Sequence, residues 1–153
     1  MSQARTLSLT TLPGLPEILA GDDLAGLIFE ALLAQGLTLI DGDILVLAQK
    51  IVSKAEGRLV NLTTITPSKR AMELAVYLEK RPELVELILR ESSEVLRTRP
   101  GTIIVAHKSG FVCANAGIDQ SNVMGPWGNP EYWVLVLPED SDSSAARIRA
   151  GLE

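Results

Sequence analysis

Apolar residues recur at helical spacing in several stretches of the chain, and these stretches predict about four helices. The first helix has its apolar stripe at Leu24, Leu27, Ile28, Ala31 and Leu32, between Gly21-Asp22-Asp23 and Gly36. Two more begin at Pro67 and Pro82, because a proline at the first helical position gives up no hydrogen bond. A last helix is predicted from about Ser143, and residues 49–57 read as a short helix or a turn.

Short apolar runs between the helices predict strands. These runs are residues 7–11, 44–48, 58–62, 95–97, 102–106, 111–114 and 133–137. Leu7 to Thr11 alternates apolar and polar residues, whereas Ile44 to Ala48 is apolar on both faces, as expected of a central strand. The mixed order favours an α+β fold with a mainly antiparallel sheet over a doubly wound one. At 153 residues, the chain has the size of a single domain spanning 1–153.

Composition and charge narrow the function classes. Apolar residues make up 46% of the chain and aromatic residues only 4%, so aliphatic side chains must supply the core. The net charge of −5 argues against nucleic acid as the main partner, although a small phosphorylated ligand needs only a few local donors. No apolar run reaches ~18 residues, and the N-terminus lacks the apolar stretch of a signal peptide. We therefore expect a cytoplasmic protein with no membrane partner.

The chain has one cysteine and one histidine. Cys113 lies in an apolar run, which favours a buried structural thiol over a nucleophile, and a single cysteine forms no internal disulfide. His107 as the only histidine excludes a histidine-rich metal site, and a solvated loop or strand edge is the expected place for it. Neither residue is assigned a catalytic role.

The run from Ala114 to Val123 concentrates oxygen-bearing side chains after an apolar strand. It supplies the Asp119 carboxylate, the Ser121 hydroxyl and three side-chain amides. Oxygen ligands suit a hard divalent cation and the phosphates it bridges. The same residue types are ordinary turn formers, so a plain turn is the alternative.

A second polar segment, Gln49 to Arg58, follows the predicted central strand. In a helix, Lys50 and Lys54 would lie one turn apart on the same face and could neutralise an anion near the helix start. A solvated basic face is the alternative. The chain has no phosphate-loop or dinucleotide-binding motif. A carboxylate for a cation and lysines for phosphates would nevertheless suit phosphoryl transfer, which needs mainly positioning and countercharge.

Five motifs in order resemble one known family. They are Gly14-Leu15-Pro16-Glu17, Asp41-Gly42-Asp43, Ser53-Lys54-Ala55-Glu56-Gly57-Arg58, Asn115-Ala116-Gly117-Ile118-Asp119-Gln120-Ser121-Asn122-Val123 and Leu137-Pro138-Glu139-Asp140-Ser141-Asp142-Ser143-Ser144-Ala145. The sequence resembles the coenzyme F-420-0:L-glutamate ligase (gamma-glutamyl ligase) family from about Leu12 onward. The resemblance implies that GTP phosphorylates a carboxylate of a deazaflavin precursor and that the amine of L-glutamate attacks the acyl phosphate. It also implies Mg²⁺ or Mn²⁺ and a homodimer.

The resemblance also assigns site residues, although it assigns none of them a catalytic role. Asp119 matches a metal ligand, and the residues matching GTP contacts are Gly14, Leu15, Pro16, Glu17, Gln49, Lys50, Lys54 and Asn122. Family members continue for roughly another hundred residues, about a further small domain, with a second metal motif that is absent here. The chain is therefore expected to be the N-terminal GTP- and metal-binding part of the enzyme, either a fragment or one half of a split protein. A non-catalytic binding or assembly module that retains the fold is the alternative, and an unrelated α+β interaction domain is a third interpretation.

Overall fold

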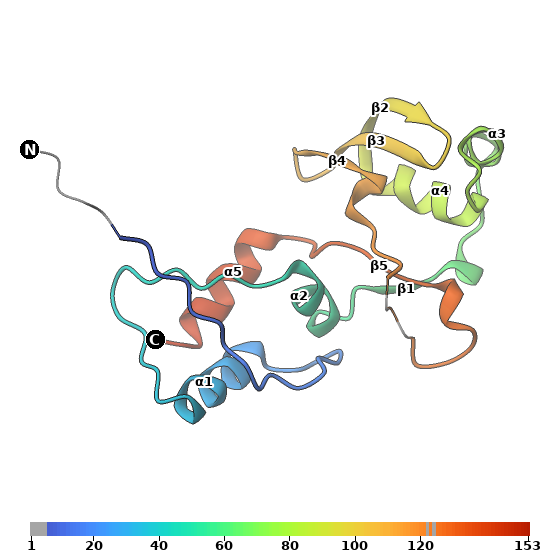
Figure 1. The fold of residues 1–153 in the computed structure, drawn as a ribbon. Helices are drawn as coiled ribbons and strands as arrows, with labels where there is room; N and C mark the ends of the chain where they lie inside the picture. Colours follow the sequence, from blue (N-terminus) through green and yellow to red (C-terminus); the bar gives the residue numbers. More distant parts are fainter. Residues whose placement is uncertain (1–5, 122, 124) are drawn as a thin grey trace, which may run out of the picture.

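Helices and two small antiparallel sheets make up the computed structural model, which describes residues 6–121, 123 and 125–153 (Figure 1). The helices are α1 (Leu24–Ala34), α2 (Gln49–Ala55), α3 (Lys69–Leu78), α4 (Pro82–Arg90) and α5 (Ser141–Ala150). The strands are β1 (Leu59–Asn61), β2 (Ser92–Arg99), β3 (Thr102–His107), β4 (Val112–Ala114) and β5 (Trp133–Leu135). The predicted α+β fold with antiparallel pairing is confirmed.

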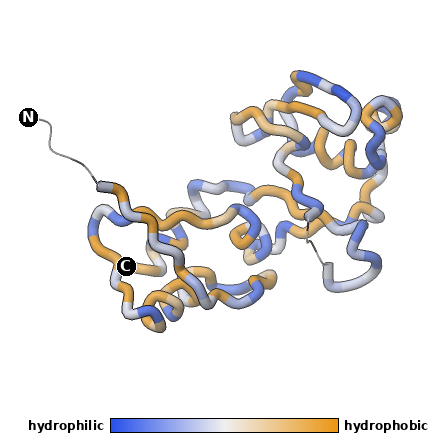
Figure 2. Tube along the Cα trace, in the orientation of Figure 1, coloured by the Kyte–Doolittle hydropathy of each residue, from blue (hydrophilic) through white to orange (hydrophobic). Residues whose placement is uncertain are grey.

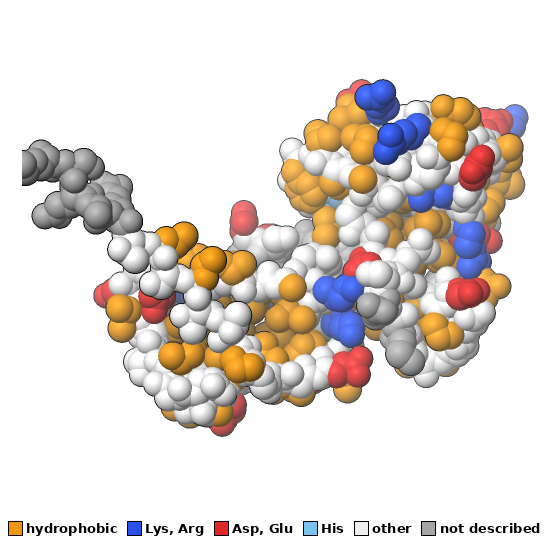
Figure 3. Space-filling model, in the orientation of Figure 1, with side chains coloured by type: hydrophobic (Ala, Val, Ile, Leu, Met, Phe, Trp, Pro, Cys, Tyr) orange, Lys and Arg blue, Asp and Glu red, His pale blue; other side chains and the backbone are white. Residues whose placement is uncertain are grey.

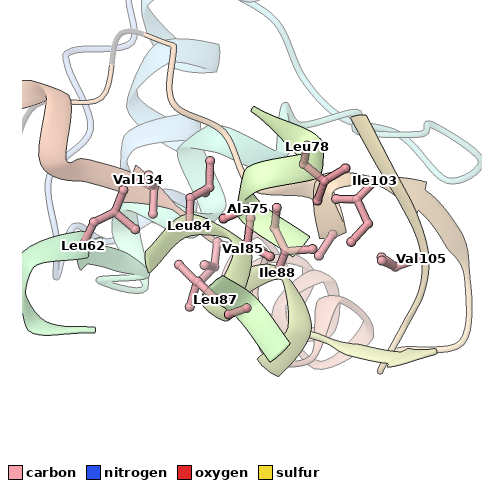
Figure 4. Packing of buried hydrophobic residues seen from close by; sticks show 13 residues of the cluster. Leu62, Ala75, Leu78, Leu84, Val85, Leu87, Ile88, Ile103, Val105 and Val134 are labelled. Atoms are coloured by element: carbon pink, nitrogen blue, oxygen red, sulfur yellow. The ribbon is translucent and has the colours of Figure 1, made fainter. Parts of the chain in front are cut away.

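The largest hydrophobic core lies where α3 and α4 pack on the β2–β3–β4 sheet (Figure 4). In β3 every second residue is buried, so Ile103 and Val105 point toward the helices. Leu78 of α3 and Ile88 of α4 meet them from the other side and are fully buried. Full burial of each such side chain contributes about 1.5–3 kcal/mol. This core therefore supplies most of the stability of that part of the chain.

A separate two-stranded ladder joins two segments that lie far apart in the sequence. β1 pairs antiparallel with β5, with Leu59 opposite Leu135 and Asn61 opposite Trp133. In Figure 1 this ladder lies between the α3–α4 part and a second group formed by α1, α2 and α5. The second group has its own apolar cluster, which includes Ile28 of α1 and Val52 of α2. The ladder thus connects the end of α2 with the segment that leads into α5.

Two predicted strands are wrong. Residues 7–11 and 44–48 are extended, but in the described part of the chain no neighbouring segment pairs with them. A strand forms only when a second segment completes its ladder of hydrogen bonds. Figure 2 shows hydrophobic residues along both segments, and neither segment belongs to a described sheet. Both segments therefore have the residue pattern of a strand, but neither has a neighbouring strand in the described structure.

The first residues of α3 and α5 are set by the side chains that cap these helices rather than by the positions predicted from the sequence. The predicted start at Pro67 is wrong, because Ser68 is the N-cap of α3 and its hydroxyl accepts a hydrogen bond from the amide of Ala71 at 3.2 Å. The start of α4 at Pro82 is confirmed. The final helix begins at Ser141 rather than about Ser143, because Asp140 is its N-cap.

His107 is buried, and the expectation of a solvated position is wrong. Its Nδ1 accepts a hydrogen bond from the Ser109 amide at 3.0 Å, and Nε2 lies 3.8 Å from a Glu91 carboxylate oxygen. Burial lowers the pKa of His107 below its usual range, although the Glu91 charge opposes the change. Cys113 is half-buried rather than fully buried and packs against the same core. Burial raises the pKa of its thiol, which fits an unreactive structural role.

Candidate functional site

Helix α2 presents two lysines to segments that lie far away in the sequence. Val52 and Ser53 are buried on its inner face, so Lys50 and Lys54 lie on the outer face, one turn apart. Lys50 Nζ lies 2.7 Å from Asp119 Oδ2, and Lys54 Nζ lies 3.4 Å from Glu17 Oε1. Figure 3 shows basic and acidic side chains gathered over α2 and β5, near the middle of this face. Three of the segments predicted to form the site therefore meet at α2.

Backbone pairing fixes the position of Asp119. Its amide donates to the Leu135 carbonyl at 2.9 Å, and the Leu135 amide donates to the Asp119 carbonyl at 2.8 Å. Leu135 also pairs with Leu59 in β1, and β1 follows α2 after only three residues. The position of Lys50 relative to Asp119 is therefore set through β1 and β5 rather than by the long side chains alone.

The turn before Asp119 has an unusual backbone. Asn115, Ala116 and Gly117 all have positive φ angles, of 51°, 54° and 68°. A side chain at Gly117 would place its Cβ only 2.8 Å from Leu137 Cδ1, so the close approach to Leu137, together with the positive φ angle, favours glycine at this position. The sequence indicated one bend at this glycine, whereas the structure has three consecutive left-handed residues.

Asp119 is held in its charged form by several donors. Its Oδ1 accepts from both the amide and the hydroxyl of Ser121 at 2.7 Å. Burial raises the pKa of Asp119, but the hydrogen bonds from Lys50 and Ser121 and the Lys50 charge outweigh it, so the pKa lies below the usual 3.8. Lys50 also donates to the Ser121 carbonyl at 2.8 Å. The sequence analysis counted the Ser121 hydroxyl among the oxygen ligands for a cation, whereas in the structure it donates to the Asp119 carboxylate, as a residue two positions after an aspartate commonly does.

The residues of the site do not by themselves form a metal centre. Both oxygens of Asp119 have donors, and the Lys50 ammonium occupies the side of Oδ2 where a cation would bind. Across residues 6–121, 123 and 125–153, no three His, Cys, Asp or Glu side chains gather closely enough to hold a metal. Mg²⁺ needs near-octahedral oxygen coordination and usually takes one or two carboxylates with waters and phosphates. Among the described residues Asp119 therefore offers a single carboxylate, and a cation there would take its other ligands from elsewhere.

The remaining predicted contacts lie around this pair. Leu15 packs against the apolar cluster of α1 and α2, and Gly14, Pro16 and Glu17 are exposed. Gln49 is turned along its own helix, since its Nε2 donates to Ser53 Oγ at 2.5 Å. Asn122 lies outside the described residues.

A buried contact that the sequence analysis did not predict fixes α5 to the end of α2. The Ser144 hydroxyl donates to Glu56 Oε1, and Arg147 Nη2 lies 2.7 Å from the same oxygen. Ser144 is buried, and Glu56 follows directly after α2. Both residues belong to motifs that carry the family resemblance, 88 positions apart. Their pairing joins two distant motifs in the structure.

This arrangement defines a class of site. It is a small charged site on an α+β scaffold, in which one short helix, a left-handed turn and an N-terminal loop bring lysines and carboxylates together without a phosphate loop. Residues 14–153 match the family described as F420-0:Gamma-glutamyl ligase. The chain belongs to this family.

Individual relatives agree with the family match. The chain is 47% identical over 147 residues to a coenzyme F420:L-glutamate ligase of Methanothermobacter thermautotrophicus, covering 96% of this chain and 56% of the relative. It is 44% identical to the protein of that name from Methanopyrus kandleri, over 96% of this chain and 54% of the relative. It is 41% identical to the protein of that name from Halorubrum lacusprofundi, over 95% of this chain and 56% of the relative. The chain thus spans about half the length of these curated relatives.

Helix length also bears on the membrane prediction. Among the described residues, none of the helices combines the length and the apolar composition required to cross a lipid bilayer.

Proposed function

We propose that this chain is the GTP- and metal-binding part of a ligase that joins L-glutamate to the deazaflavin precursor of coenzyme F420. One observation carries the proposal: α2 directs Lys50 to Asp119 and Lys54 to Glu17, two partners 69 and 37 residues away in sequence. All four residues belong to the segments assigned to nucleotide and metal. The name of these relatives, coenzyme F420:L-glutamate ligase, supports the choice of substrates.

The proposed reaction has two steps. A carboxylate oxygen of the precursor takes the γ-phosphoryl group of GTP, and GDP leaves. The glutamate nitrogen then attacks the acyl carbon, phosphate departs, and the nitrogen loses a proton as the amide forms. Both steps develop negative charge on phosphate oxygens, so correctly placed cations lower both barriers. A bound Mg²⁺ or Mn²⁺ would supply part of that countercharge.

Lys50 and Lys54 are suited to different tasks in this proposal. Lys54 is the more buried of the two, with 17% of its side chain exposed, and its 3.4 Å contact with Glu17 is long for an ion pair. It can therefore turn to a phosphate at little cost. Lys50 has a short contact with Asp119, which holds its ammonium group close to the proposed metal ligand. We propose that Lys50 leaves Asp119 when the nucleotide binds and then neutralises charge on the phosphates.

The test is a calorimetric titration of the chain with GTP, with and without Mn²⁺. Asp119→Asn should abolish the Mn²⁺-dependent part of GTP binding, and Lys54→Ala should weaken GTP binding about tenfold to a hundredfold even without metal. These factors correspond to the loss of one hydrogen bond between charged groups. Unchanged affinity in either variant would refute the role given to that residue.

Matched controls separate the site from general charge effects. Asp142→Asn removes a carboxylate from the exposed start of α5, and Lys69→Ala removes an ammonium from the exposed start of α3. No hydrogen bond or ion pair of the described structure joins either residue to α2, so both variants should bind GTP like the wild type. A loss in the controls equal to that in the site variants would assign the effect to net charge.

A non-catalytic nucleotide-binding or assembly module is the second candidate. The observation that favours it is the state of Asp119, whose two oxygens are both occupied by protein donors. GTP binding without release of GDP in the presence of precursor and glutamate would support this alternative. The ligase proposal includes three further points. The chain forms a homodimer, a separate chain supplies the rest of the enzyme, and the protein is cytoplasmic.

A further inference from the structure

The loop that leads into β5 is held in a defined shape by Trp133, which is itself buried. Gly125 lies against the indole of Trp133, since a Cβ at Gly125 would overlap the ring atoms Cδ2 and Cε2. The Trp133 Nε1–H donates to the Trp127 carbonyl at 2.7 Å, and the two indoles meet edge to face with centroids 5.0 Å apart. Three contacts with one buried side chain therefore fix residues 125–132, which we call the Trp127 loop.

The far end of the Trp127 loop is fixed as well. Asn129 Oδ1 accepts a hydrogen bond from the Glu131 amide at 3.0 Å and caps the short turn that follows. The guanidinium of Arg81 lies 4.1 Å from the centre of the Tyr132 ring, which is the geometry of a cation–π contact. The two prolines of the loop also restrict its backbone. The loop is therefore ordered before any ligand binds.

Trp127 stays open although its loop is fixed. Its side chain is 57% exposed, more than any other aromatic side chain of the chain. A covered aromatic ring buries about 150–250 Å², so an open indole offers a large contact surface. Because the loop already has its shape, a ligand that covers Trp127 orders little additional backbone when it binds. These are the properties of a preformed contact for a ligand.

The Trp127 loop follows closely after the charged site. Lys50 Nζ donates to the carbonyl and the hydroxyl of Ser121 at 2.8 Å and 3.2 Å. Val123 lies two residues further along the chain, at most about 7 Å away between Cα atoms, and it belongs to one buried cluster with Trp133. Trp133 in turn contacts Trp127. In Figure 1 the loop is the orange segment that leads into β5, beside the ladder that holds Asp119.

An ammonium group and an open indole at one site suit a particular chemical class of ligand. Phosphates require the positive charge, and a planar heteroaromatic ring stacks on an indole because both have extended π faces. A ligand that carries both groups would contact the lysines of α2 with its phosphates and Trp127 with its ring. Two such rings occur in the proposed function, namely the guanine of GTP and the deazaflavin ring of the coenzyme precursor.

We propose that the open face of Trp127 stacks on the planar ring of a phosphorylated ligand whose phosphates bind at Lys50 and Lys54. The phosphate end of this inference rests on the proposed function. The choice of Trp127 rests on the geometry of its loop, on its exposure and on its contact with Trp133.

The experiment is a calorimetric titration of the full 153-residue chain with three probes in the presence of Mn²⁺. The probes are GTP, a deazaflavin mononucleotide and inorganic tripolyphosphate, which has no ring. Trp127→Leu should weaken the ring-bearing ligand about fivefold to a hundredfold, the range for loss of one stacked base, and should leave tripolyphosphate unchanged. Whichever of GTP and the deazaflavin loses affinity is the source of the ring. Trp127→Phe keeps a planar ring and should retain more affinity than Trp127→Leu.

A matched control separates stacking from the loss of an exposed aromatic residue. Tyr77 on α3 is 53% exposed, so Tyr77→Leu removes a similar surface and should leave the affinity for all three probes unchanged. The Trp127 variants keep the backbone carbonyl that accepts the hydrogen bond from Trp133, so the loop should retain its shape.

Fluorescence gives a second measurement. The chain has two tryptophans, and Trp133 is buried, so quenching by acrylamide reports mainly on Trp127. A ring-bearing ligand that stacks on Trp127 should lower the acrylamide quenching constant, and tripolyphosphate should not. A purely structural role of Trp127 predicts no such difference between the probes.

Four results would overturn the proposal. They are unchanged affinity of Trp127→Leu for both ring-bearing probes, an equal loss of tripolyphosphate affinity in that variant, a loss in Trp127→Phe as large as in Trp127→Leu, and a dimer of the chain that Trp127→Leu dissociates. If tripolyphosphate binds the wild type but the ring-bearing probes bind no more tightly, only the inference about Trp127 fails. If none of the three probes binds the wild type, the proposed nucleotide site fails, so the two failures are distinguishable.

Discussion

The contact between Lys50 and Asp119 can be measured as a coupling energy. Lys50→Met removes the ammonium but keeps much of the apolar stem, and Asp119→Asn removes the charge while keeping the size of the side chain. The two single variants and the double variant form a double-mutant cycle. The cycle isolates the interaction from the separate effects of each substitution on folding.

The geometry sets the expected size of the coupling. The 2.7 Å distance is that of a charge-assisted hydrogen bond, but 31% of the Lys50 side chain and 25% of the Asp119 side chain remain exposed. Solvent-exposed pairs contribute about 0.2–1 kcal/mol, whereas hydrogen bonds to charged groups in drier surroundings contribute about 1.5–3 kcal/mol. We therefore expect a coupling of about 1 kcal/mol at pH 7 and 0.1 M salt.

Urea unfolding of the four proteins, followed by circular dichroism, gives the free energies of unfolding for the cycle. The pKa of Asp119 is lowered in the folded state, so the stabilisation should be complete above its unfolded value near 3.8 and should be lost as pH falls through the lower folded value. A coupling below about 0.3 kcal/mol at pH 7, or one that persists after Asp119 is protonated, would refute the idea that this pair holds the site together.

Three further predictions concern stability. Gly117→Ala should destabilise the fold by about 1–3 kcal/mol more than Gly110→Ala in urea unfolding, because both glycines have positive φ but only Gly117 is crowded, by Leu137; equal losses would contradict the packing argument. The pKa of Glu86 is lowered to about 2, so its contribution is complete above 4.5 and is lost as pH falls toward 2; Glu86→Gln should flatten that part of the stability curve. His107 has a lowered folded pKa, so its neutral form supports stability above the usual 6.5 and that support is lost as pH falls through the folded value; His107→Gln should remove this dependence, and an unchanged curve would place the titration elsewhere.

Local signals in the sequence located most of the helices. The stripe from Leu24 to Leu32 and the proline at 82 correspond to α1 and α4, because helix formation depends on neighbours three and four positions away and on the residues at the ends. The short helix α2 was predicted only as a helix or a turn. Its seven residues contain too few turns for a clear apolar stripe.

Strand prediction was less successful for a physical reason. The pattern at Ile44 to Ala48 is that of a buried strand, and the side chains do alternate, but a strand also needs a neighbour. Whether one is present depends on other parts of the polypeptide. His107 shows the same limit, since its burial depends on how β3 packs.

The sequence by itself determined the α+β class, the family, and the identity of the residues gathered at α2, since short motifs carry that information. Only the tertiary structure decided that Lys50 pairs with Asp119, because this depends on the ladder of β1 and β5 that sets the two segments side by side. It also decided that Glu56 meets Ser144. Contacts between residues 69 and 88 positions apart leave no local pattern, because they depend on how the whole chain packs.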